Sequence, residues 1–255
     1  MEALTSFQKK IISKIKVEDD SIAIIGFHEG ISGQIYEWIK EDHNISCFVN
    51  FSDVVLEIDE KLEKRNRESQ TFEYPKCDSF KNLPMITAIN YLEILDELNI
   101  KRVIVALSDN ITRHLNIKKA QEKGFEVVSV IHPSALILDD AIIHSGALIF
   151  AGTIIGYKAE IFEGAIINTG VSIDHHSIIK ECATIDPGVV MAGNVTINKY
   201  AYIYTNSTII NKICIGESAV VGAGSVVIKN ISKNTLSVGI PAKVIKNLTR
   251  GNIDE

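Results

Sequence analysis

The fold is decided by Ile161-Phe-Glu-Gly-Ala-Ile-Ile167-Asn-Thr-Gly-Val-Ser-Ile173-Asp-His-His-Ser-Ile-Ile179, in which every sixth residue is isoleucine. The same six-residue register runs from Ile137 to Val227, and the residue two positions earlier is small in almost every unit. An α-helix would show a period of 3.6 and an ordinary strand a period of 2. The register therefore indicates an internal repeat of short strands and tight corners, which becomes stable only when its units stack.

Stacked units of this kind pair their backbones with the coil above and the coil below, about 4.8 Å away. The pattern resembles the hexapeptide-repeat, left-handed parallel β-helix family, in which three hexapeptides make one triangular coil. The left hand follows from this resemblance and not from the periodicity. Sixteen units would give a little over five coils.

The composition excludes several classes of protein. The net charge of −6 argues against a nucleic-acid binder, which would be basic. The four cysteines form no C-x-x-C pair, which favours reduced thiols over a disulfide framework. No run of about 18 apolar residues predicts a membrane-spanning helix, and residues 1–20 are too charged for a signal peptide. We therefore expect a cytoplasmic protein with no membrane insertion.

Ahead of the repeat, the chain alternates strand and helix patterns. An apolar run at 21–25 ends at Gly26, a helical pattern follows over 34–40, and a second strand over 45–49 ends at Asn50. This order indicates a parallel βαβ unit. A turn with Gly26, His28 and Gly30 before a helix N-terminus is a natural phosphate cradle, although it lacks the G-x-G-x-x-G spacing.

The rest of this half predicts a polar insertion over 52–84, a helix over 84–98 and a strand over 101–107. Asp109 and Asn110 then follow the carboxyl end of that strand, where ligands bind in open α/β sheets. A helix over 111–123 and a last strand over 125–130 complete the pattern. We expect a Rossmann-like α/β domain at 1–130, the all-β solenoid at 131–236 and a closing segment at 237–255.

Four segments point to one family. They are Ile131-His-Pro-Ser-Ala135, Ala106-Leu-Ser-Asp-Asn110 with Arg113, Asn168 to Ile179, and Val238-Gly-Ile-Pro-Ala-Lys243. They resemble the junction, A-I-G-D-N…R, N-T…(D/E)-H-(D/E)-x-x-I and V-G-x-P-A-K motifs of the sialic-acid O-acetyltransferase (NeuD-like) and 4-amino-sugar N-acetyltransferase (PglD-like) group. The resemblance implies acetyl transfer from acetyl-CoA to the amino group of a nucleotide-linked 4-amino-4,6-dideoxy sugar. It also implies a homotrimer with active sites between subunits, and it covers nearly the whole chain.

The resemblance places a catalytic histidine at His175, and a histidine is the usual general base near neutral pH. The group that orients this imidazole is left open between Asp174 and Asp186. Gly193 lies eighteen residues after His175, hence one coil higher, so its backbone N–H would lie near the base. The resemblance places the oxyanion-stabilising amide at this glycine. The family's second histidine, which contacts the acetyl group, is Thr184 in this chain.

Further residues are expected to bind the two substrates. The resemblance implies that the α/β domain binds the nucleotide-linked sugar. The residues expected to contact this sugar nucleotide are Gly26, His28, Gly30, Asn50, Asp109 and Asn110. Acetyl-CoA is assigned to Thr184, Ala192, Gly193, the strip Gly222-Ala223-Gly224, Pro241 and Lys243. The segment from Lys229 to Arg250 is basic, which suits the phosphates of coenzyme A.

Other functions stay open at this stage. O-acetylation of sialic acid or a related sugar would use the same residues, and the nucleotide base is not specified. A hexapeptide-repeat zinc enzyme would need three histidines around the metal, but the repeat holds only His144 besides the adjacent His175 and His176. We therefore expect no metal. A non-catalytic sugar-nucleotide scaffold would bind its ligand and be indifferent to His175→Ala.

Overall fold

The computed structural model describes residues 6–26, 30–50 and 78–248, so the insertion predicted over 52–84 lies mostly outside the described residues. The chain divides into two compact units. The first comprises residues 1–108 and 119–127, and the second comprises 109–118 and 128–255. The first part of the helix over 110–122 thus groups with the solenoid, which no sequence pattern indicates.

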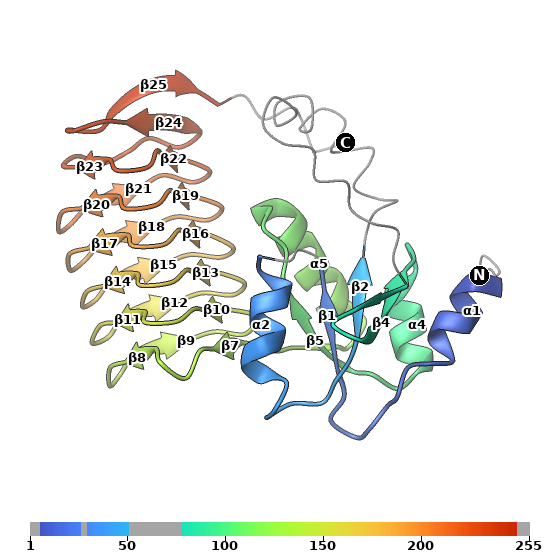
Figure 1. The fold of residues 1–255 in the computed structure, drawn as a ribbon. Coiled ribbons are helices and arrows are strands. Elements are labelled where there is room, and N and C mark those ends of the chain that lie inside the picture. The colour runs from blue at the N-terminus through green and yellow to red at the C-terminus, as the bar shows by residue number, and fades with distance from the viewer. Residues whose placement is uncertain (1–5, 27–29, 51–77, 249–255) are drawn as a thin grey trace. The chain divides into compact units, whose positions relative to one another are not determined.

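The first unit is a mostly parallel sheet with the strand order β3-β4-β2-β1-β5-β6 (Figure 1). The central strand β1 is apolar and buried along its whole length, and β5 is so after its first residue, as strands covered on both faces are. The strands are β1 Ile22–Ile25, β2 Ile45–Asn50, β3 Ser79–Phe80, β4 Leu83–Thr87, β5 Arg102–Val105 and β6 Glu126–Val127. The helices of this unit are α1 Ser6–Ile12, α2 Ser32–Ile39 and α4 Tyr91–Glu97, together with the end of α5 Asn110–Glu122.

Two predicted elements differ from the structure. The strand predicted over 125–130 is two strands in different sheets, β6 and β7 Val130–Ile131. The sequence pattern indicated a helix over 84–98, but the structure forms β4 over Leu83–Thr87 and begins α4 only at Tyr91. Met85 and Ile86 of β4 are buried beside Phe48 and Val49 of β2, its parallel neighbour. Pairing along the sheet therefore overrides the helical spacing of the local apolar residues.

The second unit is a three-sided parallel β-helix whose two-residue strands rise one above another (Figure 1). Strands eighteen residues apart pair in parallel, as Ile154-Ile155 does with Ser172-Ile173. Side one runs from β7 Val130–Ile131 through β10 Leu148–Ile149, β13 Ile166–Ile167, β16 Thr184–Ile185, β19 Tyr202–Ile203 and β22 Val220–Val221 to β24 Thr235–Val238 and β25 Lys243–Asn247. Side two holds β8 Leu136–Ile137, β11 Ile154–Ile155, β14 Ser172–Ile173, β17 Val190–Met191, β20 Thr208–Ile209 and β23 Val226–Val227. Side three holds β9 Ile142–Ile143, β12 Glu160–Ile161, β15 Ile178–Ile179, β18 Thr196–Ile197 and β21 Cys214–Ile215.

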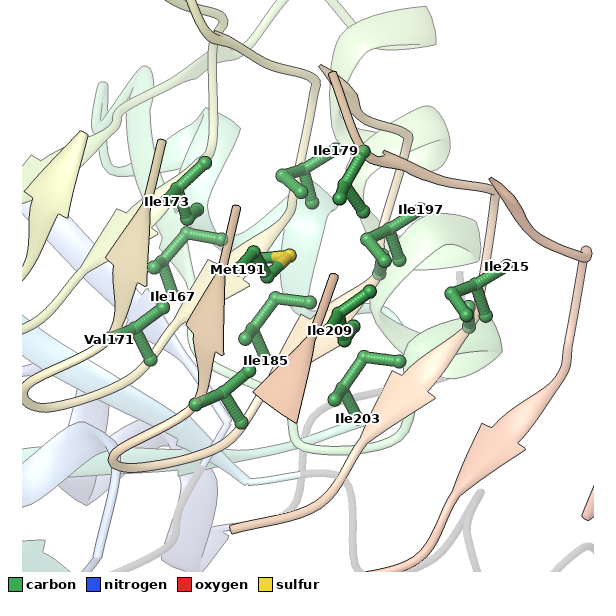
Figure 2. Close-up of a cluster of buried hydrophobic side chains, with 14 of the residues drawn as sticks. Ile167, Val171, Ile173, Ile179, Ile185, Met191, Ile197, Ile203, Ile209 and Ile215 are labelled. Atoms are coloured by element: carbon green, nitrogen blue, oxygen red, sulfur yellow. The ribbon is translucent and has the colours of Figure 1, made fainter. Parts of the chain in front are cut away.

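The six-residue register fills the interior of this unit. Ile167, Ile173 and Ile179 come from three different sides and point into one core (Figure 2). All three are fully buried, as is the small residue two positions before each of them. The predicted inward aliphatic and small corner residue are thus both present, and burial of these rows is the main force that holds the coils together.

Three rows of corners join the three sides. The His175 corner contains Tyr157-Lys158, His175-His176 and Gly193-Asn194 and lies between sides two and three. The glycine corner contains Gly170, Gly188 and Gly224 and lies between sides one and two. The α5 corner contains Gly164, Cys182 and Tyr200, and the first part of α5 packs on it. The second residue of each turn takes a positive φ, which glycine and asparagine adopt most readily.

Candidate active site

His175 lies at the His175 corner, where backbone hydrogen bonds hold three successive coils in line. The N–H of His176 donates to the carbonyl of Tyr157 (2.9 Å), and the N–H of Asn194 donates to the carbonyl of His175 (2.9 Å). The side chain of His175 is 49% exposed. The imidazole is therefore fixed at its base by the stacked coils and open to solvent at its ring.

Gly193 lies directly above this imidazole. A Cβ atom built on Gly193 would lie 2.5 Å from Nε2 and 2.9 Å from Nδ1 of His175, so only glycine leaves room for the ring. Among the described residues, the N–H of Gly193 makes no intramolecular hydrogen bond. The coil geometry thus places an available amide donor beside an exposed imidazole.

Neither carboxylate considered from the sequence forms a hydrogen bond with this imidazole in the described structure. Asp174 Oδ1 accepts from the backbone N–H of His175 (2.7 Å), and Asp174 Oδ2 lies 4.0 Å from Nε2. Asp186 Oδ1 accepts from the Tyr202 hydroxyl (3.2 Å) and from the Asn168 amide (3.4 Å). Partial burial raises the pKa of the Asp186 carboxyl, which faces a different part of the coil.

The residue in hydrogen-bond range of the ring is one that sequence reasoning did not assign. His176 Nδ1 lies 3.1 Å from His175 Nδ1, and the two rings are nearly perpendicular, at 84°. In the resembled motif an acidic residue follows the histidine, and this chain has His176 at that place. Its contact depends on the side-chain geometry at the corner, which the spacing of residues does not reveal.

Asn110 and Thr184, expected to bind the sugar and acetyl-CoA, are buried together at the α5 corner. The guanidinium of Arg113, which is fully buried, donates to Asn110 Oδ1 (2.8 Å), to Thr184 Oγ1 (3.0 Å) and to the carbonyl of Gly164 (2.7 Å). Thr184 also donates to Asn110 (2.6 Å). In this structure their polar atoms are used to attach the start of α5 to the coils. Burial lowers the pKa of Arg113.

The residues expected at the sugar end lie at one edge of the first sheet. Ile25 of β1 pairs in register with Val49 of β2 and with Val105 of β5, so Gly26 and Asn50, the next residue along each of the first two strands, lie at a common edge. Gly26 has φ +106°, and a Cβ there would lie 2.7 Å from the carbonyl oxygen of Ala106. Ser32 of α2 donates to the carbonyl of Gly26 (2.8 Å).

Three other residues were predicted to bind the sugar nucleotide. Gly30 lies in the turn before α2, whose N-cap residue makes no side-chain cap hydrogen bond. His28 lies outside the described residues. Asp109 accepts a hydrogen bond from the backbone N–H of Thr112 (2.7 Å), as an N-cap of α5 does.

Five of the residues expected to bind acetyl-CoA fall on two different corners of one chain. Ala192 and Gly193 lie at the His175 corner, whereas Gly222, Ala223 and Gly224 lie at the glycine corner. A Cβ on Gly224 would meet no atom within 4 Å, so that surface is open, while Gly222 packs against a side chain of β24. Pro241 and Lys243 are exposed, and Lys243 begins β25.

Two features of the described residues bear on metal binding and membrane insertion. Across residues 6–26, 30–50 and 78–248, no group of three or more His, Cys, Asp or Glu side chains could hold a metal ion. The helices in these same ranges are all too short or too polar to span a membrane.

Comparison by sequence finds relatives that match part of the chain. No protein-family model matches the chain. The serine acetyltransferase of Buchnera aphidicola subsp. Schizaphis graminum is 41% identical over 56 residues, which are 22% of this chain and 22% of that protein. A Saccharomyces cerevisiae protein whose name places it among acetyltransferases is 40% identical over 62 residues, 24% of this chain and 32% of its own. The matches thus span a third or less of these curated relatives.

Comparison by structure covers almost the whole chain. PerB from Caulobacter crescentus, solved in complex with CoA and GDP-perosamine, matches with a TM-score of 0.77 and 25% identity over 91% of this chain and 99% of that chain. The acetyltransferase domain of PglB from Neisseria gonorrhoeae, in complex with acetyl coenzyme A, matches with a TM-score of 0.73 and 22% identity over 89% of this chain and 100% of that domain. The predicted Rossmann-like domain followed by a left-handed parallel β-helix is confirmed. In fold and domain order, the chain is similar to the sugar acetyltransferases of the hexapeptide-repeat family.

Proposed function

We propose that this protein transfers the acetyl group of acetyl-CoA to the amino group of a nucleotide-linked sugar. The observation that carries the proposal is the pairing of His175 with Gly193, an exposed imidazole beside an available backbone amide. A base and an oxyanion donor within one coil of each other are what acyl transfer to an amine requires.

In the proposed reaction, Nε2 of His175 accepts a proton from the sugar amine as the nitrogen attacks the thioester carbonyl. The Gly193 N–H donates to the oxyanion that forms, which is worth about 2.7–4 kcal/mol for one such donor. The tetrahedral intermediate then expels the coenzyme A thiolate, and the imidazolium returns the proton to it. Asp174 Oδ2, at 4.0 Å, stabilises the charged imidazolium through space.

The sugar nucleotide is assigned to the first unit. The edge formed by Gly26 and Asn50 lies at the carboxyl ends of parallel strands, next to the start of α2, and such edges bind phosphate-containing ligands. PerB, the neighbour at 25% identity, was solved with CoA and GDP-perosamine bound. A GDP-linked 4-amino sugar is therefore the first acceptor to test.

We further propose that the protein is a homotrimer with its active sites between copies. Side two of the solenoid exposes an apolar face, with Leu136 53%, Ile154 41% and Val190 48% exposed. This face separates the His175 corner from the glycine corner. If side two of each copy faces a three-fold axis, the His175 corner of one copy meets the glycine corner of the next. The two groups of acetyl-CoA residues, separated within one chain, then line one groove.

The chemistry is tested with a thiol-release assay. Acetyl-CoA is combined with uridine-, guanosine- and thymidine-linked 4-amino-4,6-dideoxy sugars and with free sialic acid, using the wild type, His175→Asn and the control His144→Asn. We expect turnover on one nucleotide-linked amine, at least 100-fold slower for His175→Asn and unchanged for the control. Turnover on sialic acid alone would replace amine transfer with O-acetylation. Ligand binding without any turnover would identify a scaffold.

The assembly is tested by light scattering. Val190→Lys introduces a charge into the face on side two, and Ile142→Lys introduces the same charge at a comparably exposed residue (52%) on side three. We expect a trimer for the wild type and Ile142→Lys, and dissociation for Val190→Lys. A wild-type monomer, or a trimer that survives the Val190 change, would contradict this arrangement.

A further inference from the structure

We propose that His176 is the positioning residue of this site and that it sets the tautomer of His175, an inference that rests on the proposed function. The observation is the 3.1 Å separation of the two Nδ1 atoms. Only one proton can occupy a hydrogen bond between two neutral imidazole nitrogens. The two rings must therefore adopt complementary tautomers.

The direction of that hydrogen bond decides whether His175 can act as a base. If His175 Nδ1–H donates to His176 Nδ1, then Nε2 of His175 carries a lone pair and can accept a proton. If His176 donates instead, Nε2 of His175 is protonated and the base is lost. A neutral imidazole has one donor and one acceptor nitrogen, and the partner of the first sets the state of the second. The proposed base needs a lone pair on Nε2 of His175. We therefore assign the first arrangement, in which His176 carries its own proton on Nε2.

The corner holds the His176 ring in place for this role. Its backbone has φ +57° and is fixed by the hydrogen bond from its N–H to the Tyr157 carbonyl. The Tyr157 ring also meets the His176 ring edge to face, with centroids 5.8 Å apart. The carboxylate of Asp174 does not compete for Nδ1 of His175, because one of its oxygens binds the backbone N–H and the other lies toward Nε2.

The repeat itself supplies matched variants for a test. The place of His176 in its coil is filled by Lys158 one coil below, at φ +55°, and by Asn194 one coil above, at φ +60°. His176→Asn and His176→Lys therefore both suit the backbone. The asparagine Oδ1 can accept from His175 Nδ1, whereas lysine offers no acceptor.

The first measurement needs no acetyl donor. Long-range ¹H–¹⁵N correlation spectra of ¹⁵N-histidine-labelled protein at neutral pH report which ring nitrogen carries the proton. We expect the Nδ1–H form of His175 in the wild type and in His176→Asn, and a shift toward the Nε2–H form in His176→Lys. An Nε2–H form of His175 in the wild type, or identical tautomers in all three proteins, would overturn the proposal.

The second measurement is the kinetics of acetyl transfer. Removing a hydrogen bond to a group that becomes charged should lower kcat about tenfold or more in His176→Lys, with KM for acetyl-CoA unchanged, while His176→Asn stays within about threefold. Equal losses in both variants would count against a role for the acceptor atom. The two measurements fail separately. Absence of turnover with the expected spectra removes the proposed function. Turnover with the opposite tautomer leaves acetyl transfer in place and removes the roles given to His176 and to Nε2 of His175.

Discussion

Gly193→Ala is the substitution whose effect follows most directly from the geometry of the site. The new Cβ would lie 2.5 Å from Nε2 of His175, whereas ordinary van der Waals contact begins near 3.4 Å. The backbone at Gly193 does not have a positive φ, so alanine itself is not strained there. The clash must therefore be relieved by the imidazole, which has to move by about 1 Å because its Cε1 is the atom nearest to the new Cβ.

A displacement of about 1 Å at a reacting group costs on the order of 100-fold in rate. We expect kcat for acetyl transfer to fall by about that factor in Gly193→Ala. Stability should change by less than about 1 kcal/mol, because the half-exposed ring can turn into solvent and the Gly to Ala change restricts the unfolded chain. Thiol release measures the rate, and urea unfolding measures the stability.

The double variant tests whether the loss passes through the imidazole. With His175→Ala already present, the alanine at Gly193 has no ring to displace, so we expect no further loss of rate beyond about threefold. A Gly193→Ala protein that keeps its kcat, or a double variant much slower than His175→Ala alone, would refute the reasoning. The first result would mean that the ring does not react where it lies, and the second that Gly193 acts independently of it.

Three further predictions concern stability and thiol chemistry. Arg113→Met leaves the buried carbonyls of Gly164 and Cys182 without their donor, so urea unfolding should show a loss of about 2–5 kcal/mol, and an unchanged midpoint would contradict the buried network. Burial raises the pKa of the Asp186 carboxyl, so its ionisation opposes folding above the unfolded pKa of 3.8. Asp186→Asn should therefore raise Tm at pH 7 and lose this advantage at pH 3. A gain in Tm confined to pH 3 would mean that the charge of Asp186 stabilises the fold and would contradict the raised pKa. In a Cys77→Ser background at pH 8, a disulfide reagent should modify exposed Cys214 and spare Cys182, whose buried thiol has a pKa raised to about 11, as mass mapping of the labelled peptides would show.

The solenoid could be predicted almost completely from its sequence. The six-residue period of the aliphatic side chains arises because these side chains point inward. The period alone therefore identifies the buried rows that contain Ile167, Ile173 and Ile179. The position of Gly193 above His175 followed from the same arithmetic, because stacking returns the chain to the same corner every eighteen residues. Regular backbone pairing makes both predictions insensitive to the details of side-chain packing.

Contacts that depend on side-chain direction could not be predicted in this way. The helical spacing at Met85 gave no sign of the neighbouring strand that makes this segment β4. Asn110 and Thr184 have the polar character of ligand-binding residues, but Arg113 binds both of them inside the protein. The contact between His176 and His175 depends on a corner with positive φ and on two ring rotations.

The most direct test of acetyl transfer at this site is the mass of the acceptor after reaction. The wild type and His175→Asn would each be incubated with acetyl-CoA carrying a ¹³C-labelled acetyl group and a GDP-linked 4-amino sugar, and the product analysed by mass spectrometry. We expect a sugar nucleotide with one labelled acetyl group on its amine, formed at least 100-fold more slowly by the variant. Equal rates of acetylation in the two proteins would contradict the proposed mechanism, because His175 could not then be the base.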